Sequence, residues 1–462
     1  MLTATTGASA PLTSLRKLGF AALLLFLFIL NSRVFDIVLT TLHLPSLSLA
    51  AALGAAFISG GIMRAFSNRI GAALICLTVW MCMAVPFSVW RGGAANTVYD
   101  RWFKSFLIYF IVAALIYTWG HFRRTYFVLA ISVLVLAFVA LKYGTYVEGR
   151  LFLNRGRFGN PNDLAQILLM SLPFWWFIAT NPALKPSRRF FAYLATLPIF
   201  LTIAMTGSRG ALIATTILLA ILFLRSPLKQ KVQLAAIGGI VLTVAVATLP
   251  SVLKERYFTY FKPTDPTGWA RSLIMAQVQD DATSSTYARW ALLQDSITLT
   301  FQNPLFGVGP GMFDVAQDVY SWQTRGRKGA WQVTHNTYTE ISSESGIPAL
   351  ILYVLTLVFT WQATRINRPR DAVLSPRQAE MVSAAFALRL SLVVFAVSAM
   401  FASFAYQPQM LLLAGLGVAL RRSVAMEFNT AEERPRASVA RFHPVAHPVL
   451  LLQHDRSRRQ TA

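Results

Sequence analysis

The stretch Trp331-Gln-Val-Thr-His335-Asn336-Thr-Tyr338-Thr-Glu340-Ile-Ser-Ser-Glu344-Ser-Gly346 closes the one long polar segment of a sequence that is otherwise mostly apolar. A hydrophobic run long enough to cross a membrane follows directly. The stretch therefore predicts a boundary between a polar surface and a membrane, with a histidine at that boundary. If this protein performs chemistry, we expect it around His335.

The composition of the whole chain agrees with a membrane setting. The 462 residues are 55% hydrophobic and 13% charged, with a mean hydropathy of +0.52. A soluble domain carries about twice that share of charged residues. The apolar residues also come in long blocks, so we predict an all-α, polytopic integral membrane protein. The first apolar run follows Arg16 and Lys17 and can act as an uncleaved anchor.

Membrane spans are predicted as runs of roughly 17–25 apolar residues between polar breaks. Twelve runs qualify in this sequence, and they divide it into spans 1–9 over residues 1–250, a large polar loop over 251–337, spans 10–12 over 338–421, and a tail over 422–462. The predicted spans are 16–32, 44–63, 70–88, 104–120, 124–143, 162–180, 189–205, 210–225, 231–250, 338–362, 382–405 and 408–421.

The basic residues orient these spans. With the N-terminus in the cytoplasm, every inner connector is rich in Lys and Arg, as the positive-inside rule requires. Most of the net charge of +23 is then a topology signal and does not indicate a nucleic acid partner. We expect both ends of the chain in the cytoplasm. The tail from about residue 423 is rich in Arg, Pro, Ala and His and is predicted to be disordered.

The loop over residues 251–337 is too long to be a simple connector. It carries eight Lys/Arg and seven Asp/Glu, so it is not simply basic. Apolar residues recur at three- and four-residue spacings from Ser285 to Phe301, until Asn303-Pro304 interrupts the pattern. We predict an amphipathic helix here, lying over the face of the membrane. Its apolar positions are Tyr287, Trp290, Ala291, Leu293, Ile297 and Phe301.

Three groups of arginines stand out on the predicted outer side, against the positive-inside bias. They lie in Arg155-Gly-Arg157-Phe-Gly159-Asn160-Pro161-Asn162, in the short turn Thr206-Gly207-Ser208-Arg209-Gly210, and as Arg289 on the loop helix. The planar guanidinium group suits phosphate because it forms paired, charge-assisted hydrogen bonds. Each arginine alone could equally contact a lipid phosphate or form an ion pair. Gathered at one surface, they would form a diphosphate clamp.

His335 lies at the start of a predicted helix, with Asn336 as a plausible cap. A lone histidine is most often structural, yet a histidine that titrates near neutral pH can also take a proton from a sugar hydroxyl. The Cys and His spacings do not suggest a metal site, and no metal or other cofactor is expected. The glycines from Gly307 to Gly311 are interpreted as a turn, because no Lys-Ser/Thr pair follows them.

These motifs, in this order, resemble the O-antigen ligase and O-antigen polymerase superfamily of membrane glycosyltransferases. The similar pieces are Gly-Arg157-Phe-Gly-Asn160-Pro-Asn162, Gly-Ser208-Arg209-Gly, Tyr287-Ala-Arg289-Trp290, Asn303-Pro304-Leu-Phe-Gly307-Val-Gly309-Pro-Gly311, His335-Asn336-Thr-Tyr338 and Glu344-Ser-Gly346. The resemblance covers roughly residues 150–420.

The resemblance implies a GT-C-like, metal-independent, inverting enzyme of the bacterial inner membrane with a periplasmic active face. Its donor would be a glycan on undecaprenyl diphosphate, and its acceptor lipid A–core or another glycan. His335 would act as the base or orient the acceptor. The resemblance further implies diphosphate binding by Arg157, Arg209 and Arg289, support of His335 by Asn336 and Glu344, and further substrate contacts from Arg155, Asn160, Asn162, Ser208 and Tyr338.

Two alternatives stay open from the sequence. Within the family, the motifs do not separate a ligase from a polymerase of O-antigen or exopolysaccharide repeat units. From another class, a transporter or flippase of lipid-linked glycan predicts charges buried within the spans and broken helices at mid-membrane. The charges of this sequence collect at one outer rim instead, which favours the enzyme.

Overall fold

The structure is a computed structural model that describes residues 10–37, 43–147, 149–154, 160–258, 273–366 and 374–440. Its elements are nearly all helical. The first half comprises α1 (Ala10–Ser32), α2 (Val34–Ile37), α3 (Leu44–Ile58), α4 (Gly61–Phe66), α5 (Arg69–Ala84), the short helix η1 (Val85–Phe87), α6 (Arg91–Asn96), the π-helix η2 (Thr97–Phe103), α7 (Lys104–Leu115), α8 (Trp119–Tyr143), and the antiparallel strands β1 (Thr145–Val147) and β2 (Arg150–Phe152).

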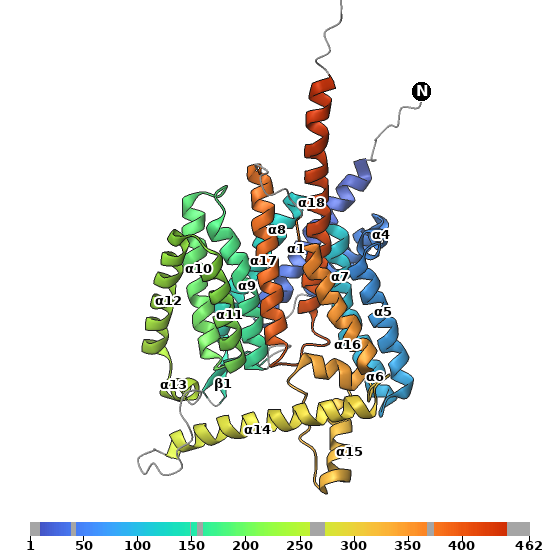
Figure 1. Cartoon of the computed structure of the whole chain (residues 1–462), viewed down its shortest axis with the longest axis vertical. Coiled ribbons are helices and arrows are strands. Elements are labelled where there is room, and N and C mark those ends of the chain that lie inside the picture. The colour runs from blue at the N-terminus through green and yellow to red at the C-terminus, as the bar shows by residue number, and fades with distance from the viewer. Residues whose placement is uncertain are drawn as a thin grey trace, which may run out of the picture. The chain divides into compact units, whose positions relative to one another are not determined.

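The second half is helical throughout its described elements. It comprises α9 (Pro161–Thr180), α10 (Pro186–Met205), α11 (Arg209–Arg225), α12 (Leu228–Thr248), α13 (Ser251–Phe258), α14 (Leu273–Gln302), α15 (Phe313–Arg325), α16 (Thr337–Ala363), α17 (Pro376–Ser398) and α18 (Pro408–Ala440). Figure 1 shows how these elements are arranged.

Seven of the described helices are long and apolar enough to cross a membrane: α1, α5, α8, α9, α10, α16 and α17. The prediction of an all-α, polytopic membrane protein is confirmed. Each of the twelve predicted spans overlaps a helix of the structure. That the remaining five also cross the membrane stays a prediction, as does the division into membrane and loop regions.

The helix that contains the last predicted span extends beyond that span. The span is predicted to stop near residue 421, with a disordered tail from 422, but α18 continues to Ala440. The prediction of disorder is therefore wrong for residues 422–440, whereas the end of the membrane-crossing part stays a prediction. A predicted span ends at the first charged residues, here Arg421-Arg422, because it is defined by an apolar run. A helix can nevertheless continue in a polar environment through the residues that follow, Ser-Val-Ala-Met-Glu-Phe. Residues 441–462 lie outside the described part of the chain. The chain divides after Val424 into two units.

Within the first unit, α9 lies at the centre of the helical bundle. It packs against α8, α10 and α17, while α1 packs against α3 and α8, and α5 packs against α16. Buried hydroxyl groups join neighbouring helices: Ser391 donates to the carbonyl of Met170 at 3.0 Å, and Tyr126 donates to that of Ala384 at 3.1 Å. Such bonds satisfy polar groups that hydrocarbon cannot.

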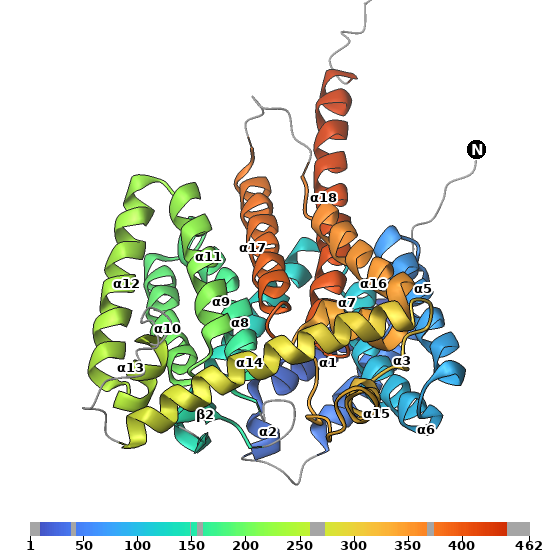
Figure 2. The same ribbon diagram turned by 60° about the horizontal axis from the view of Figure 1, so that its bottom comes forward.

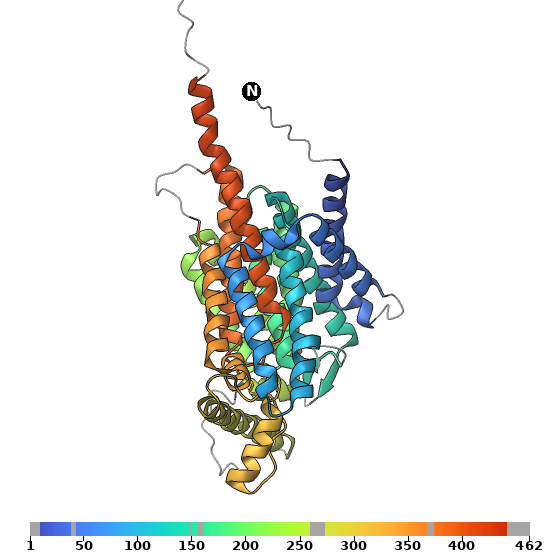
Figure 3. The ribbon, with the colours of Figure 1, turned by 90° about the vertical axis from the view of Figure 1, so that its right-hand side faces the viewer.

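One end of the bundle, at the bottom of Figure 1, carries the hairpin β1–β2, α13, α14 and α15; we refer to it as the site end. Here α14 runs crosswise to the spanning helices, over their ends (Figures 1 and 2). Figure 3 shows it nearly along its axis, with α15 beside it. The helix predicted from Ser285 to Phe301 is confirmed, although it begins earlier, at Leu273.

Gly346 divides α16 into two segments. Its φ of 85° and ψ of 172° are non-helical, so residues 337–345 form a short helix at the site end and residues 347–363 form the spanning part. The backbone N–H of Ile347 donates to the carbonyl of Pro304 at 2.8 Å. A Cβ atom on Gly346 would lie 1.8 Å from the carbonyl oxygen of Leu305. The predicted span 338–362 is therefore broken where the loop packs onto it.

Replacing Gly346 with alanine tests this contact. We expect Gly346→Ala to destabilise the folded protein by at least about 1–3 kcal/mol, because it combines an unfavourable backbone conformation with a collision against main chain. Thermal unfolding in detergent would measure the loss. Gly54→Ala is the matched control, since a Cβ at Gly54 meets nothing within 4 Å. Equal melting temperatures for the two variants would contradict the assigned role of Gly346.

Candidate active site

A polar cavity of about 520 Å³ opens among the helix ends at the site end. Its lining combines two basic and three acidic side chains with a histidine, two amides and two hydroxyl groups. These residues come from η2, α7, α9, α16 and the loops beside them. The lining residues are Asp100, Arg101, Lys104, Asn160, Asp163, Val333, His335, Glu340, Ala402, Ser403, Tyr406 and Gln407.

His335 is held in this cavity in a strained conformation. Its φ of 54° lies in the left-handed region, which is uncommon for a residue with a side chain. Its backbone N–H donates to the hydroxyl of Ser403 at 3.1 Å. Next to it, the Thr337 hydroxyl donates to the carbonyl of Ala402 at 2.7 Å. The segment 399–407 thus fixes His335 from the side, and such enforced strain is characteristic of functional sites.

Burial and, to a smaller extent, the positive charge of Arg289 together lower the pKa of His335 from 6.5 to about 4. Desolvation disfavours the imidazolium form, and a nearby cation repels it. The imidazole is therefore neutral at physiological pH and is able to accept a proton. The electrostatic effect also places Arg289, from α14, near His335.

Three other predicted residues lie around His335 in different roles. Asn160 lines the cavity and its side chain also accepts the N–H of Asn162, capping α9. Asn336 is the cap of α16, where its side-chain oxygen accepts the N–H groups of Tyr338 and Thr339 at 3.0 and 3.2 Å. The hydroxyl of Tyr338 donates to the carbonyl of Ala396 on α17 at 3.0 Å. Asn336 and Tyr338 therefore fix the helix start that carries His335, and neither lines the cavity.

Glu344 is buried behind the cavity wall, where it organises the backbone. Its carboxylate accepts the N–H groups of Gly311 at 2.8 Å and Phe313 at 3.3 Å, and the hydroxyl of Tyr406 at 2.6 Å. Tyr406 in turn lines the cavity. The structure therefore places Glu344 one contact removed from the cavity, where it supports Tyr406 and the loop before α15.

Asn162 and Ser208 join two segments that are far apart in the sequence. The Ser208 hydroxyl and the Arg150 guanidinium both donate to the Asn162 side-chain oxygen, at 2.7 and 3.1 Å. Arg150 also donates to the carbonyl of Thr206 at 3.0 Å. Ser208 accepts the N–H of Ala211 and so caps α11. These contacts tie the hairpin, the start of α9 and the turn before α11 together.

Arg209 is the first residue of α11. Its neighbour Gly210 packs so closely on Phe401 that an added Cβ would lie 2.8 Å from the Cβ of that residue. Phe401 belongs to the same segment 399–407 that holds His335. Arg209 and His335 therefore flank one loop, although Arg209 does not line the cavity itself. Arg155 and Arg157 lie outside the described residues.

The sequence reasoning missed several of the lining residues. Arg101 and Lys104 lie at or beside the predicted outer segment 89–103, so the argument applied to Arg209 would have found them. No such signal marks Asp163 and Glu340, which lie in the first turns of apolar helices. The π-helix η2, which carries Arg101, is also not predictable from the pattern, and π-helical turns frequently occur at functional sites.

Comparison with known families is consistent with this geometry. Residues 194–354 match the family model described as O-antigen ligase. This part of the chain is therefore similar to the O-antigen ligase family. The match contains Arg209, Arg289 and His335, so the resemblance drawn from short motifs is confirmed. No curated protein matches the sequence significantly. The O-antigen ligase family and the spanning helices together identify a multi-pass membrane protein.

The charge state of His335 can be tested without any substrate. In protein labelled on its histidine rings, we expect the NMR titration of His335 to have its midpoint near pH 4. Arg289→Gln should move the midpoint upward, because a repelling cation is removed, but leave it below 6.5, because burial is the larger cause. A midpoint at the ordinary histidine value in both proteins would contradict the buried setting.

Proposed function

We propose that this protein is an O-antigen-ligase-type glycosyltransferase. It moves a glycan from undecaprenyl diphosphate to a hydroxyl of lipid A–core or a similar acceptor, at the periplasmic face of the bacterial inner membrane. The observation that carries the proposal is a neutral, strained His335 in a polar cavity beside Arg289, within the region that matches the O-antigen ligase family.

In the proposed reaction, the acceptor hydroxyl oxygen bonds to the anomeric carbon of the donor sugar. The bond from that carbon to the diphosphate oxygen breaks, and its electron pair leaves with undecaprenyl diphosphate. His335 takes the hydroxyl proton as general base. Attack from the face opposite the leaving group inverts the anomeric centre. A histidine that is neutral at physiological pH supports this role.

The arginines are proposed to stabilise the leaving group. Negative charge develops on the diphosphate as the bond breaks, and preorganised cations are most effective at that point. Arg289 acts from α14, and Arg209 acts from the start of α11 across the segment 399–407. Arg155 and Arg157 are proposed to complete the clamp. Arginine then supplies the positive charge that a metal would supply in other enzymes.

The cavity itself is proposed to hold the acceptor sugar. With three acidic side chains against two basic ones, its lining suits a polyhydroxylated ligand better than a diphosphate. Asp163 and Glu340 offer carboxylate oxygens, and Asn160 and Gln407 offer amides, all of which hydrogen-bond to hydroxyl groups. The donor then approaches from the arginine side, so that His335 lies between the two substrates.

A polymerase is the alternative within the same chemistry. It uses the same donor and the same base, and differs in that its acceptor is a second lipid-linked repeat unit. The description of the matching family favours the ligase. Deletion of the gene distinguishes the two, because loss of a ligase leaves full-length undecaprenyl-linked polymer, whereas loss of a polymerase leaves single lipid-linked repeat units.

The proposal predicts the effect of removing the base and the clamp. In proteoliposomes supplied with undecaprenyl-diphosphate glycan and acceptor, we expect His335→Ala to reduce the transfer rate by roughly 10²–10⁴-fold, the usual contribution of a general base. Arg209→Ala should reduce it by roughly 10²–10³-fold, through loss of leaving-group stabilisation. The released undecaprenyl diphosphate and the glycosylated acceptor would both be quantified.

Two variants serve as matched controls for these substitutions. His43→Ala and Arg188→Ala remove the same residue types at exposed positions that do not line the cavity. They should transfer at the rate of the unaltered protein. Normal transfer by His335→Ala and Arg209→Ala at equal protein levels would disprove the mechanism.

The assignment of the cavity to the acceptor makes a separate prediction. Asp163→Asn should raise the KM for the acceptor by about tenfold, the equivalent of one good hydrogen bond. The KM for the donor should stay unchanged, because the donor is proposed to bind on the arginine side. Steady-state kinetics with each substrate varied in turn would measure both constants. A rise in the KM for the donor alone would contradict the assignment and would place the donor, instead of the acceptor, in the cavity.

A further inference from the structure

Helix α14 presents an aromatic face that no other part of the described structure covers. Tyr287, Trp290, Ile297 and Phe301 are 72%, 59%, 42% and 73% exposed. Their spacing of three, seven and four residues places them on one side of the helix. The residues on the opposite side are buried: Leu292, Asp295, Ser296, Leu299 and Thr300. The larger apolar side chains of this segment thus point outward.

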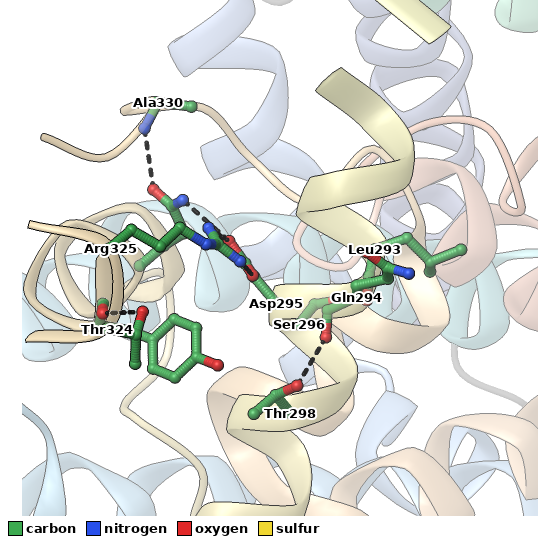
Figure 4. Close-up of polar contacts among 10 residues, drawn as sticks. Leu293, Gln294, Asp295, Ser296, Thr298, Thr324, Arg325 and Ala330 are labelled. Carbon is green, nitrogen blue, oxygen red and sulfur yellow. Dashed lines mark hydrogen bonds and ion pairs between the residues drawn. The ribbon is translucent and has the colours of Figure 1, made fainter. Parts of the chain in front are cut away.

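A buried ion pair fixes the rotation of α14 that produces this face. Asp295, only 2% exposed, accepts from the guanidinium of Arg325 on α15 and from the amide of Gln317 at 3.0 Å. The Gln317 side-chain oxygen accepts the N–H of Ala330 at 2.9 Å, which extends the network to the next loop (Figure 4). Leu292 and Leu299 pack with Val308, Met312 and Phe313 on the same side. Rolling the helix to bury its aromatic face would break this network.

The height of α14 relative to the membrane follows from its C-terminal contacts. Thr300 shares a hydrogen bond of 2.9 Å with Ser342, in the first part of α16. Two residues after the helix, the carbonyl of Pro304 accepts the N–H of Ile347, where the spanning part of α16 begins. The end of α14 therefore lies at the level at which a membrane span ends. That level is the bilayer surface.

Other exposed apolar side chains continue the face of α14 around the site end. Leu305, just after α14, is 60% exposed, and Phe87 and Trp90, just after α5, are 62% and 60% exposed. Phe306 stacks between Trp80 and Phe87 and connects the two regions. Aromatic side chains at the ends of spans are typical of the membrane–water interface, where their rings meet the head groups.

We propose that α14 is an interfacial anchor whose face of Tyr287, Trp290, Ile297 and Phe301 inserts into the head-group region of the leaflet at the site end. The occupant of this face is the bilayer surface. An amphipathic helix that lies in the plane of the membrane with aromatic residues on its apolar side is a general mode of interfacial binding. Here the helix is also joined rigidly to a span, which holds it at that depth.

The anchor has a consequence for the cavity. Arg289 directly precedes Trp290, and its positive charge contributes to lowering the pKa of His335. Insertion of Trp290 therefore sets the depth of Arg289 as well, so the membrane surface itself positions one of the cations beside the cavity. This arrangement would suit any reactant whose charged group lies at the head-group level of the bilayer.

Site-directed fluorescence tests the anchor in the full chain. Cys76 and Cys82, both exposed on α5, are first replaced by alanine. Single cysteines are then introduced as Ile297→Cys and Phe301→Cys on the aromatic face, each labelled with an environment-sensitive fluorophore. In nanodiscs containing phospholipid that carries a spin label near its head group, we expect these two labels to lose most of their fluorescence.

The matched controls lie on the same helix. Ala288→Cys and Gln302→Cys are also exposed, but they lie away from the aromatic side. Labels there should keep most of their fluorescence. Equal quenching at all four positions, or none at Ile297 and Phe301, would overturn the proposal. Disulfide-linked dimers through Ile297→Cys would also overturn it, because they indicate that a second copy of the chain covers this face. Protection of that cysteine from labelling only when glycan is added would overturn it as well, because it indicates that glycan covers the face. No substrate is needed, so this outcome is independent of the proposed transferase activity.

Discussion

The contact between Gly346 and the main chain of Pro304 and Leu305 is the constraint on which the site end depends. It breaks α16 at the membrane boundary, so that residues 337–345 can leave the direction of the span. The same contact holds the loop after α14 against the start of that span. Only glycine allows this approach, since it combines a positive φ with main chain in van der Waals contact. His335 and α14 both take their positions from this junction.

Two buried carboxyl groups, those of Glu340 and Glu344, hold the loops beside this junction in place. Glu344 accepts two backbone N–H groups of the loop before α15 and the hydroxyl of Tyr406, and Glu340 accepts the N–H of Ala405 at 3.1 Å. Buried loops have few water molecules to satisfy their backbone groups, so side-chain oxygen atoms from the helices accept these hydrogen bonds instead. The segment 399–407 is fixed in this way, and it holds His335 on one side and packs against the start of α11 on the other.

The proposed binding places of the donor and the acceptor follow from the positions of the charged and polar side chains. Arg289 and Arg209 lie on separate helices, α14 and α11, while carboxyl and amide groups make up much of the cavity lining. We therefore propose different binding places for an anionic donor and a hydroxylated acceptor. The imidazole between them is kept neutral by burial and by Arg289. On our inference, the bilayer surface adds a third constraint, because it fixes the depth of the helix that carries Arg289.

The sequence by itself determined the fold class, a helix at each predicted span, the helix that ends before Asn303-Pro304, and the resemblance to the O-antigen ligase family. It could do so because apolar run length, helical periodicity and short motifs are local properties. It could not determine that Asn336 and Tyr338 hold the start of α16, that Asn162 and Ser208 join two distant segments, or that Asp163, Glu340 and Arg101 line the cavity. It also placed the end of α18 too early, at the first charged residues. Those features were decided only by the tertiary structure, because they depend on which backbone groups are left to be satisfied once the helices have packed, and no local pattern encodes that outcome.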